Sequence, residues 1–170
     1  MPWIILDPVG GTYNGEITPL TSVDYKYLRP IRIHEKDGWF DWHEYVKNHP
    51  LMKVYKLRRK GKREILGVIA LNYRDGVFVD SLETSLHSRH MPTDQKQYVN
   101  LADIMISFAA LWGLHHYKDD FVGLIPKDNK REYYKHKFGA RPMGAVYALN
   151  PVVITRMIGL YYLEGDDSYA

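Results

Sequence analysis

Three short stretches of the sequence carry residue types and spacings that could do chemistry. The first is "VFVDSLET", an alternating run in which Val79, Ser81 and Glu83 would share one face of a strand. Small polar neighbours suit a carboxylate that faces a cleft, and a carboxylate in a cleft can act as a general base. The alternative for Glu83 is a surface carboxylate paired with Arg89 or a lysine.

The second stretch is "YYKHKFGA", a tyrosine pair one turn before a glycine. Adjacent residues lie about 100° apart around a helix, so Tyr133 and Tyr134 do not face the same cleft. One of them reaches a cleft, or both pack at the edge of the core with their hydroxyls in water. Gly139 is typical of a helix end.

The third stretch is "QYVNLADIM", in which Gln97, Asn100 and Ala102 precede a long helical pattern. A helix N-terminus offers free backbone N–H groups and a partial positive charge, which suit an anion such as a pyrophosphate. A small residue there lets phosphates approach the backbone. Asn tolerates left-handed backbone angles, so we expect a tight turn at Asn100.

Several other chemistries lack support in this sequence. There is no cysteine, which excludes disulfides, thiolate catalysis and cysteine-ligated zinc. His87 and His90 have the spacing of metal ligands but no matching carboxylate, so we expect no metal. The motifs G-x-S-x-G, G-x-G-x-x-G and G-x-x-x-x-G-K are absent, which argues against hydrolase, dinucleotide and nucleoside-triphosphate sites.

Composition predicts one globular domain, with 170 residues of which 45% are hydrophobic and 25% charged. A net charge of +3 is too mild to imply nucleic acid, so no nucleic-acid partner is expected. The run "KLRRKGKR" holds six basic residues without interleaved aromatics, and we interpret it as a solvated turn. The start "MPWIILDPVGG" is not a signal peptide and no apolar run reaches eighteen residues, which predicts a cytoplasmic protein without a membrane partner.

Periodicity and turn residues predict the elements that must position these side chains. Residues 1–20 suggest short extended pieces joined by turns, and three antiparallel strands are expected at 51–59, 63–73 and 77–86. Further strands are expected within 121–128 and 145–150. Helices are expected within 21–32, 37–50 and 98–117, then from a cap at Asp128 or Asn129 to Gly139, and from Pro151 to Tyr161. The fold class is α/β (α+β), a mixed, largely antiparallel sheet flanked by helices.

This order of elements resembles the GNAT superfamily of N-acetyltransferases over about residues 50–163, and in particular a bacterial GNAT-like subgroup of mostly unassigned function. The stretch "VFVDSLETSLHSR" is similar to the central strand of that subgroup, which ends in Glu before a short loop with Asn-Arg. Glu83 and Arg89 match that pattern, and Ser88 stands in place of the Asn. The resemblance implies a GNAT-like fold with an extra C-terminal helix.

The other two stretches carry the resemblance further. "QYVNLADIM" is similar to the superfamily's pyrophosphate loop, Gln/Arg-x-x-Gly-x-Gly/Ala, with Asn100 in place of the first glycine. "KDNKREYYKHKFGA" is similar to the subgroup's helix with Lys-Thr, His-Tyr and Gly-Ala; Lys127, Tyr134, Gly139 and Ala140 match, and Tyr133 replaces the histidine.

The resemblance implies direct acetyl transfer from acetyl-CoA to a primary amine, without a metal. It assigns Glu83 as the base that deprotonates the amine and Tyr134 as the acid that protonates the CoA thiolate. Cofactor contacts are implied for Arg89, for Thr84, Ser85 and Leu86 at the thioester carbonyl, and for Gln97, Tyr98, Val99, Asn100, Leu101 and Ala102 around the pyrophosphate.

We expect a single domain over residues 1–170, divided into a variable acceptor side (1–50), an acyl-CoA-binding core (51–149) and a C-terminal helix (150–163). The acceptor amine is unspecified, and the oligomeric state is open, with a homodimer as one option. The alternative function is a GNAT fold that has lost catalysis and serves as a binding or regulatory module. Asn100 and Ser88 are the residues that favour it.

Overall fold

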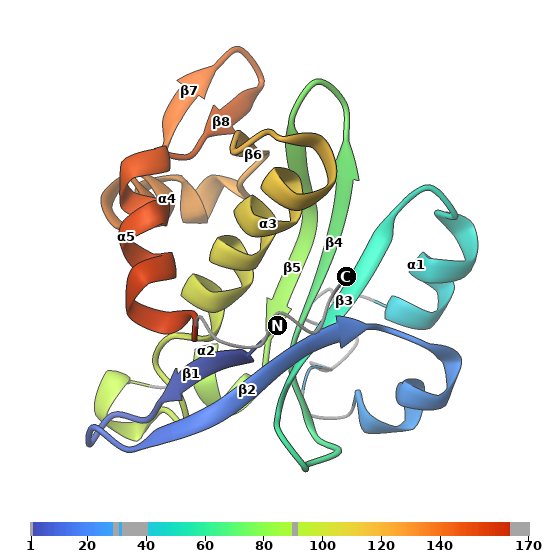
Figure 1. Ribbon diagram of the computed structural model, residues 1–170, viewed down its shortest axis with the longest axis vertical. Helices are drawn as coiled ribbons and strands as arrows, with labels where there is room; N and C mark the ends of the chain where they lie inside the picture. The colour runs from blue at the N-terminus through green and yellow to red at the C-terminus, as the bar shows by residue number, and fades with distance from the viewer. Residues whose placement is uncertain (1, 29–30, 32–40, 90–91, 164–170) are drawn as a thin grey trace.

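The computed structural model describes residues 2–28, 31, 41–89 and 92–163. Across these residues eight strands form one sheet in the order β1-β2-β3-β4-β5-β6-β8-β7, and only the β5–β6 pair is parallel (Figure 1). The strands are β1 (Pro2–Leu6), β2 (Thr12–Pro19), β3 (Lys53–Arg59), β4 (Ile65–Tyr73), β5 (Val77–Thr84), β6 (Val122–Leu124), β7 (Arg141–Met143) and β8 (Val146–Ala148). The expected mixed, largely antiparallel sheet is confirmed.

Helices cover both faces of this sheet (Figure 1). They are the 3₁₀ helices η1 (Ser22–Tyr27), η3 (Thr93–Gln95) and η4 (Asp128–Lys130), and the α-helices α1 (Trp42–Asn48), α2 (Leu86–Arg89), α3 (Leu101–Tyr117), α4 (Arg131–Phe138) and α5 (Pro151–Tyr161). In the part of the chain that is described, no helix is both long and apolar enough to cross a membrane.

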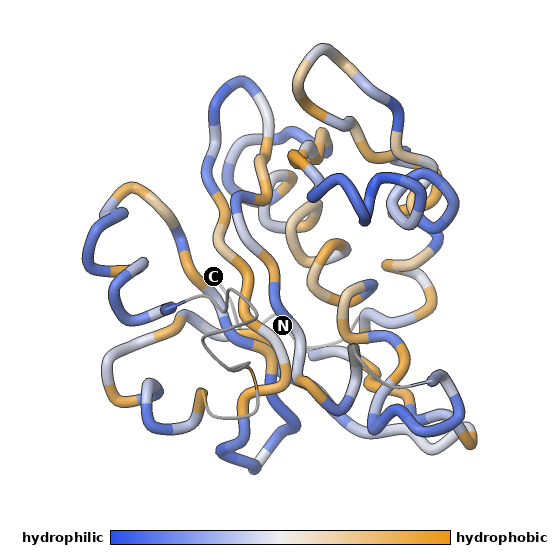
Figure 2. The backbone as a smooth tube through the Cα atoms, turned by 180° about the vertical axis from the view of Figure 1, so that it is seen from behind, coloured by the Kyte–Doolittle hydropathy of each residue, from blue (hydrophilic) through white to orange (hydrophobic). Residues whose placement is uncertain are grey.

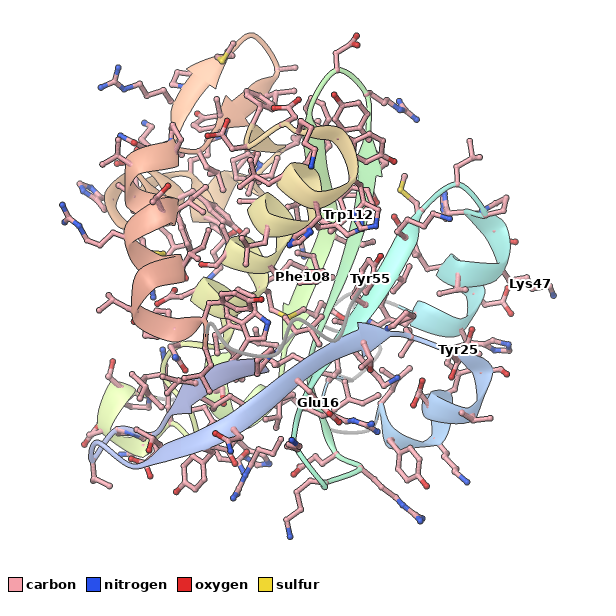
Figure 3. The ribbon with its side chains drawn as sticks, viewed as in Figure 1. Glu16, Tyr25, Lys47, Tyr55, Phe108 and Trp112 are labelled. Atoms are coloured by element: carbon pink, nitrogen blue, oxygen red, sulfur yellow. The ribbon has the colours of Figure 1, made fainter. Side chains whose placement is uncertain are left out.

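The helix α3 is the centre of the larger hydrophobic core. It contacts β4 and β5 on one side and α5 on another, so its middle turns are buried all round instead of on the single face that periodicity predicts. Tyr55 of β3 meets this helix directly, with its ring 4.8 Å from that of Phe108 and its hydroxyl accepting a 2.9 Å hydrogen bond from the indole of Trp112 (Figure 3).

A smaller core lies on the opposite face of the sheet, under η1 and α1. Its members are Leu20, Leu28, Ile31, Trp42, Tyr45, Val54, Ile65, Val68 and Ala70. The Asp41 side chain caps α1 by accepting from the N–H groups of His43 and Glu44. The earlier part of the helix expected at 37–50, through residue 40, lies outside the described residues.

Helix ends follow the sequence signals at some sites and not at others. Asn150 caps α5, with Pro151 as the first helical residue, and Gly139 ends α4 with a left-handed φ of 59°. The expected cap of α4 at Asp128 or Asn129 is wrong, because these residues form the separate turn η4 and α4 starts only at Arg131.

Two features of the sheet have no signal in the hydrophobic pattern. The strand β7 is three exposed residues that form a hairpin with β8, so it shows no alternation. The pairing of β4 with β5 shifts between Ala70 and Leu71, which oppose Ser81 and Val79 respectively. Asp80 is therefore the extra residue of a β-bulge.

Segments from elsewhere in the chain cover the outer edge of β1. At one end the N–H of Val99 donates to the carbonyl of Leu6 at 2.9 Å. At the other end Tyr162 forms a bridge with Trp3, and the N–H of Leu163 donates to the carbonyl of Pro2 at 3.2 Å. An edge strand that is covered in this way offers few free groups for pairing with another chain.

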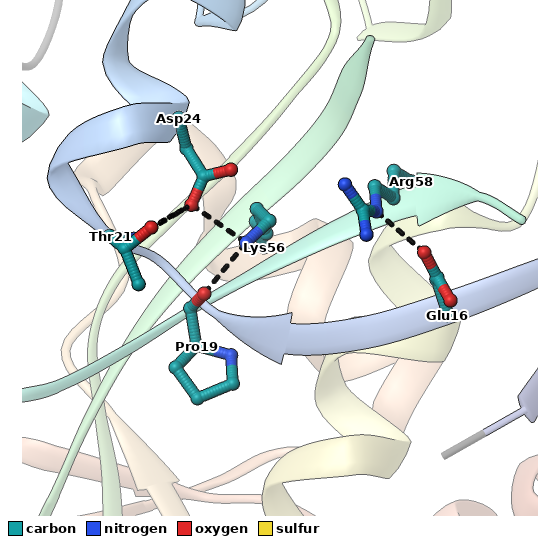
Figure 4. A network of polar contacts seen from close by, with 6 residues as sticks. All are labelled: Glu16, Pro19, Thr21, Asp24, Lys56 and Arg58. Atoms are coloured by element: carbon teal, nitrogen blue, oxygen red, sulfur yellow. Dashed lines mark hydrogen bonds and ion pairs between the residues drawn. The ribbon is translucent and has the colours of Figure 1, made fainter. Parts of the chain in front are cut away.

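A buried ion pair fixes η1 against β3 (Figure 4). The Lys56 ammonium lies 2.7 Å from a carboxylate oxygen of Asp24 and donates to the carbonyl of Pro19. The N–H and hydroxyl of Thr21 donate to the same oxygen of Asp24, at 2.8 and 2.7 Å. Burial by itself raises the pKa of Asp24, but the hydrogen bonds from Lys56 and Thr21 outweigh it and lower that pKa.

Asp24→Ala should lower the free energy of unfolding at pH 7 by about 3 kcal/mol, because it leaves the buried Lys56 charge unpaired. The double variant Asp24→Ala/Lys56→Met should recover most of this loss, as urea unfolding would measure. Since the folded pKa of Asp24 is lowered, its stabilisation is present above the unfolded pKa and lost as pH falls through the folded pKa. The gap between parent and Asp24→Ala should therefore narrow in acid, and a gap that does not depend on pH would contradict this account.

Candidate functional site

The strand β5 loses its partner on one side halfway along its length. It pairs with β6 only from Val77 to Val79, where β6 ends at Leu124, and pairs with β4 along its whole length. The N–H of Ser85 donates to the carbonyl of Leu66, just past the end of the ladder. Because alternate residues of an antiparallel strand bond to the same neighbour, the backbone groups of Leu82 and Thr84 point to the open side.

Because of this open edge, the backbone N–H groups that could polarise a thioester carbonyl differ from those that the resemblance implies. The expectation from the resemblance names Thr84, Ser85 and Leu86. The N–H of Ser85 is already bonded to β4, whereas the register directs those of Leu82 and Thr84 into the gap beyond β6. Oxyanion stabilisation needs donors aimed at the developing charge, and Leu82 and Thr84 meet that need in this ladder.

The bulge at Asp80 decides which way Glu83 points. The expectation that Val79 shares a face with Ser81 and Glu83 is wrong, because the extra residue reverses the alternation. Val79 packs into the larger core, while Glu83 pairs with Val68 and faces the smaller core under α1. The bulge thus places the carboxylate on the side of the sheet that residues from the first fifty cover.

Two aromatic side chains of α1 hold carboxylates on β5. The indole N–H of Trp42 donates to Glu83 at 2.7 Å, and the hydroxyl of Tyr45 donates to Asp80. Burial first, and then the bond to Asp80, raises the pKa of Tyr45, so the phenol stays protonated. Sequence reasoning missed Asp80, Trp42 and Tyr45 as site residues; the Trp-x-x-Tyr spacing on one helix face was the available signal.

Half of the backbone donors of the expected pyrophosphate loop, residues 97–102, are already in use. The first three residues bond within the protein: Gln97 N–H to His87 O, Tyr98 N–H to the Ser88 hydroxyl, and Val99 N–H to Leu6 O. The first-turn N–H groups of α3, those of Leu101, Ala102 and Asp103, have no partner within the helix by its geometry. Any pyrophosphate site on this loop is therefore centred on residues 101–103. Arg89 is the last residue of α2.

Asn100 fastens the start of α3 to the edge strand β1. Its side-chain oxygen accepts from the Leu6 N–H at 2.9 Å, and its side-chain nitrogen donates to the Ile4 carbonyl at 2.8 Å. The amide thus bonds to β1 as a neighbouring strand would. The φ of Asn100 is −121°, so the expected left-handed turn is wrong. This pairing explains why an amide, and not glycine, occupies the position.

A buried carboxylate sits in the first turn of the same helix. Asp103 is 5% exposed and lies 2.8 Å from the ammonium of Lys137 on α4. Burial raises the pKa of Asp103, and the pairing with Lys137 only partly offsets that effect. The ion pair joins α3 to α4 and reduces the negative charge next to the helix N-terminus.

The paired tyrosines of α4 lie in different surroundings. Tyr133 is 39% exposed, and the Lys137 ammonium lies 5.7 Å from its ring centre. Tyr134 is partly buried against the larger core and contacts Phe138, with ring centres 5.7 Å apart. Burial, and to a smaller extent Tyr133, raises the pKa of Tyr134 to about 12. A tyrosine is protonated at neutral pH even without this shift, and the shift makes the phenol a weaker acid than an exposed tyrosine.

Within the described ranges no group of three or more His, Asp or Glu side chains could hold a metal ion. His87 is exposed at α2, and its predicted partner His90 lies outside the described residues.

The sequence matches no protein-family model and no curated protein, but the fold has clear structural relatives. AtaT complexed with acetyl-methionyl-tRNAfMet superposes with a TM-score of 0.58 at 16% identity, over 85% of this chain and 99% of that one. AtaTR bound with AcCoA gives 0.57 at 14% identity, over 85% and 98%. Apo FdhC, described as a nucleotide-linked sugar GNAT, gives 0.54 at 9% identity, over 86% and 92%. The chain therefore has the GNAT fold.

The expectation that excluded a nucleic-acid partner was wrong. AtaT, which shares this fold over most of its length, is found in complex with a tRNA. The error has a physical cause, because a net charge of +3 averages over the whole surface and says nothing about how basic side chains are grouped.

Asn100→Gly, which installs the glycine of the family loop, should lower the free energy of unfolding by about 2 to 3 kcal/mol in urea. The reason is the loss of two part-buried hydrogen bonds to β1 together with the added backbone freedom of glycine. Asn129→Gly in the exposed turn η4 is the matched control and should cost well under about 1 kcal/mol. Equal stability of parent and Asn100→Gly would show that the amide does not hold β1.

Proposed function

We propose that the protein is an acyl-CoA-dependent N-acyltransferase that moves an acetyl group from acetyl-CoA to a primary amine. The observation that carries this proposal is the open stretch of β5 beyond Val79, which bears Glu83 on the α1 side. The GNAT fold supports it, as does the acetyl-CoA bound to AtaTR. The helix α3 begins shortly after this strand, so an anion-binding N-terminus and an open strand edge occur in one short segment.

Acetyl-CoA could occupy the N-terminus of α3 and the open edge of β5 at the same time. Its pyrophosphate would accept hydrogen bonds from the N–H groups of residues 101–103, where the helix dipole favours negative charge. Its pantetheine arm is an extended chain with two amides, and such a chain can add to a strand edge through backbone hydrogen bonds. The backbone carbonyls of Leu82 and Thr84 can accept such bonds on the open side of β5, which leaves their N–H groups for the oxyanion.

The transfer is a direct displacement. Glu83 takes a proton from the acceptor ammonium, and the amine lone pair attacks the thioester carbonyl to form a C–N bond. The N–H groups of Leu82 and Thr84 stabilise the oxyanion until the C–S bond breaks. Tyr134, a phenol that is protonated at neutral pH, gives its proton to the departing thiolate. With no cysteine in the sequence, no acyl-cysteine intermediate is formed.

The acceptor would approach from the face that η1 and α1 cover. Two carboxylates, Asp80 and Glu83, lie on the bulged part of β5, and the rings of Trp42 and Tyr45 bond to them. Carboxylates and aromatic rings together favour a cationic ligand. This supports an ammonium acceptor over a hydroxyl acceptor, with η1 and α1 on the acceptor side.

The second candidate, a GNAT fold without catalysis, is favoured by the start of α3. Asn100 is committed to β1, and Asp103 places a carboxylate in the turn that would hold the pyrophosphate. A protein of this kind would bind neither CoA nor acetyl-CoA. CoA binding, measured by calorimetry, therefore separates the two functions.

Ala102→Glu should abolish CoA binding, because it adds a negative charge beside the N–H groups that would hold the pyrophosphate. The matched control is His115→Glu, which adds a carboxylate to an exposed position at the other end of α3 and should leave CoA affinity unchanged. Calorimetric titration with CoA measures both. Parent-like affinity in Ala102→Glu would place the CoA site elsewhere.

Glu83→Gln should lower turnover by roughly a hundredfold or more, the usual effect of removing a general base, with CoA affinity little changed. The measurement is release of free CoA from acetyl-CoA against a panel of primary amines. Normal turnover in the variant would restrict Glu83 to a structural bond with Trp42.

Tyr134→Phe should slow the same reaction without weakening acetyl-CoA binding, because it removes the acid that protonates the thiolate. Tyr133→Phe is the control one residue away on the more exposed side of α4 and should keep the parent rate. Equal rates for the two variants would remove tyrosine from the mechanism.

A further inference from the structure

The turn between β3 and β4 carries a group of unpaired positive charges. Lys56 and Arg58, on β3 itself, are bonded to Asp24 and Glu16. The four basic residues nearer the turn are Arg59, Lys60, Lys62 and Arg63, and no carboxylate among the described residues forms an ion pair with any of them. Figure 2 shows this turn as a hydrophilic segment at the end of the sheet.

Tyrosines from three other elements lie against these charges. The Arg59 guanidinium is 4.0 Å from the ring centre of Tyr13 on β2 and donates a long hydrogen bond of 3.4 Å to the hydroxyl of Tyr98. Tyr13 and Tyr98 meet edge to face with ring centres 5.7 Å apart. On the other side of the turn, Arg63 donates to the hydroxyl of Tyr27 on η1 at 3.2 Å. The fold thus supplies the aromatic neighbours that the basic run lacks in sequence.

A pocket of about 230 Å³ opens between the turn and the loop before α3. It is lined by Arg59, Lys62, Glu64, Leu66, Gln97 and Tyr98. The volume is several times the roughly 30 Å³ share of a water molecule, enough for a phosphate group. Two cationic side chains against the single carboxylate of Glu64 give the pocket a net positive lining.

This pocket is separate from the open edge of β5 proposed for the pantetheine arm of acetyl-CoA, although Gln97 and Tyr98, which line it, belong to the loop that leads to the proposed pyrophosphate site. In the sheet, β4 and β6 flank β5 on opposite sides. The pocket lies on the β4 side, at Leu66 and the β3–β4 turn, whereas the open edge of β5 faces the gap beyond β6. A ligand could occupy the pocket without filling that gap.

We propose that this surface, formed by Arg59, Lys60, Lys62 and Arg63 with the half-buried rings of Tyr13 and Tyr27, binds single-stranded nucleic acid, while the buried Tyr98 supports Arg59 from beneath. Lysines on a turn neutralise backbone phosphates, and the pocket accepts one phosphate between Arg59 and Lys62. Tyrosine rings and arginine guanidinium groups provide stacking surfaces for unpaired bases. A basic surface with aromatic rings beside it fits a single strand, whose bases are exposed for stacking, better than a duplex.

The test measures binding of fluorescein-labelled 12-nucleotide RNA and DNA single strands to the full chain by anisotropy, over a range of salt. Lys60→Glu/Lys62→Glu should weaken binding at least tenfold at low salt and reduce the slope of log K against log salt by about 1.4, for two lost phosphate contacts. The control Lys47→Glu/Arg156→Glu makes the same charge change at exposed positions on α1 and α5 and should bind as the parent does. Comparison of the RNA and DNA strands shows which sugar is preferred, and binding of either strand supports the proposal.

Three results would overturn the proposal: no binding by the parent, equal losses in both double variants, or displacement of the strand by saturating CoA. Displacement would make the pocket a part of the CoA site. Tyr27→Leu should weaken binding about tenfold, since it removes a stacking surface and keeps every charge. Unchanged affinity of Tyr27→Leu for the strand would also contradict the proposal. None of these measurements depends on acetyl transfer, so the outcome is independent of the proposed enzymatic function.

Discussion

The two hydrogen bonds from the Asn100 side chain to β1 set the position of the N-terminal end of α3. They join a helix start to a strand edge that would otherwise expose unpaired backbone groups. The position of the first turn of α3 relative to β5 follows from this junction, and so does the place where an anion could bind. The same side chain that makes the loop unlike a glycine-rich phosphate loop therefore also holds that loop in place.

The strand β5 separates the two halves of the proposed chemistry. Its open backbone edge faces the gap beyond β6, while the bulge at Asp80 turns Glu83 toward α1 on the opposite face of the sheet. A regular strand would have placed Glu83 on the same face as Val79, against the larger core. One inserted residue thus turns Glu83, the base proposed for the acceptor amine, to the α1 face of the strand whose open edge is proposed for acetyl-CoA.

Sequence reasoning predicted the elements whose signals are local. The caps at Asn150 and Gly139 and the extents of the three central strands follow from local signals, and each is present in the structure. Hydrophobic periodicity does not predict the bulge at Asp80, the exposed strand β7 or the bonds of Asn100, because these features depend on residues far away in the chain. The tyrosines beside the β3–β4 turn were missed for the same reason, because they come from three distant segments.

The pairing of Trp3 with Tyr162 and of Pro2 with Leu163 brings the two ends of the described chain together. Contacts over such a separation close almost the whole described chain into a ring, so their loop-closure entropy cost is the largest in the fold. Because the two ends of the described chain lie side by side, they could be joined and the chain opened at another place. A circularly permuted chain could be joined across these ends and opened at the exposed Gly144 turn between β7 and β8. All other strand pairs of the sheet would stay as they are.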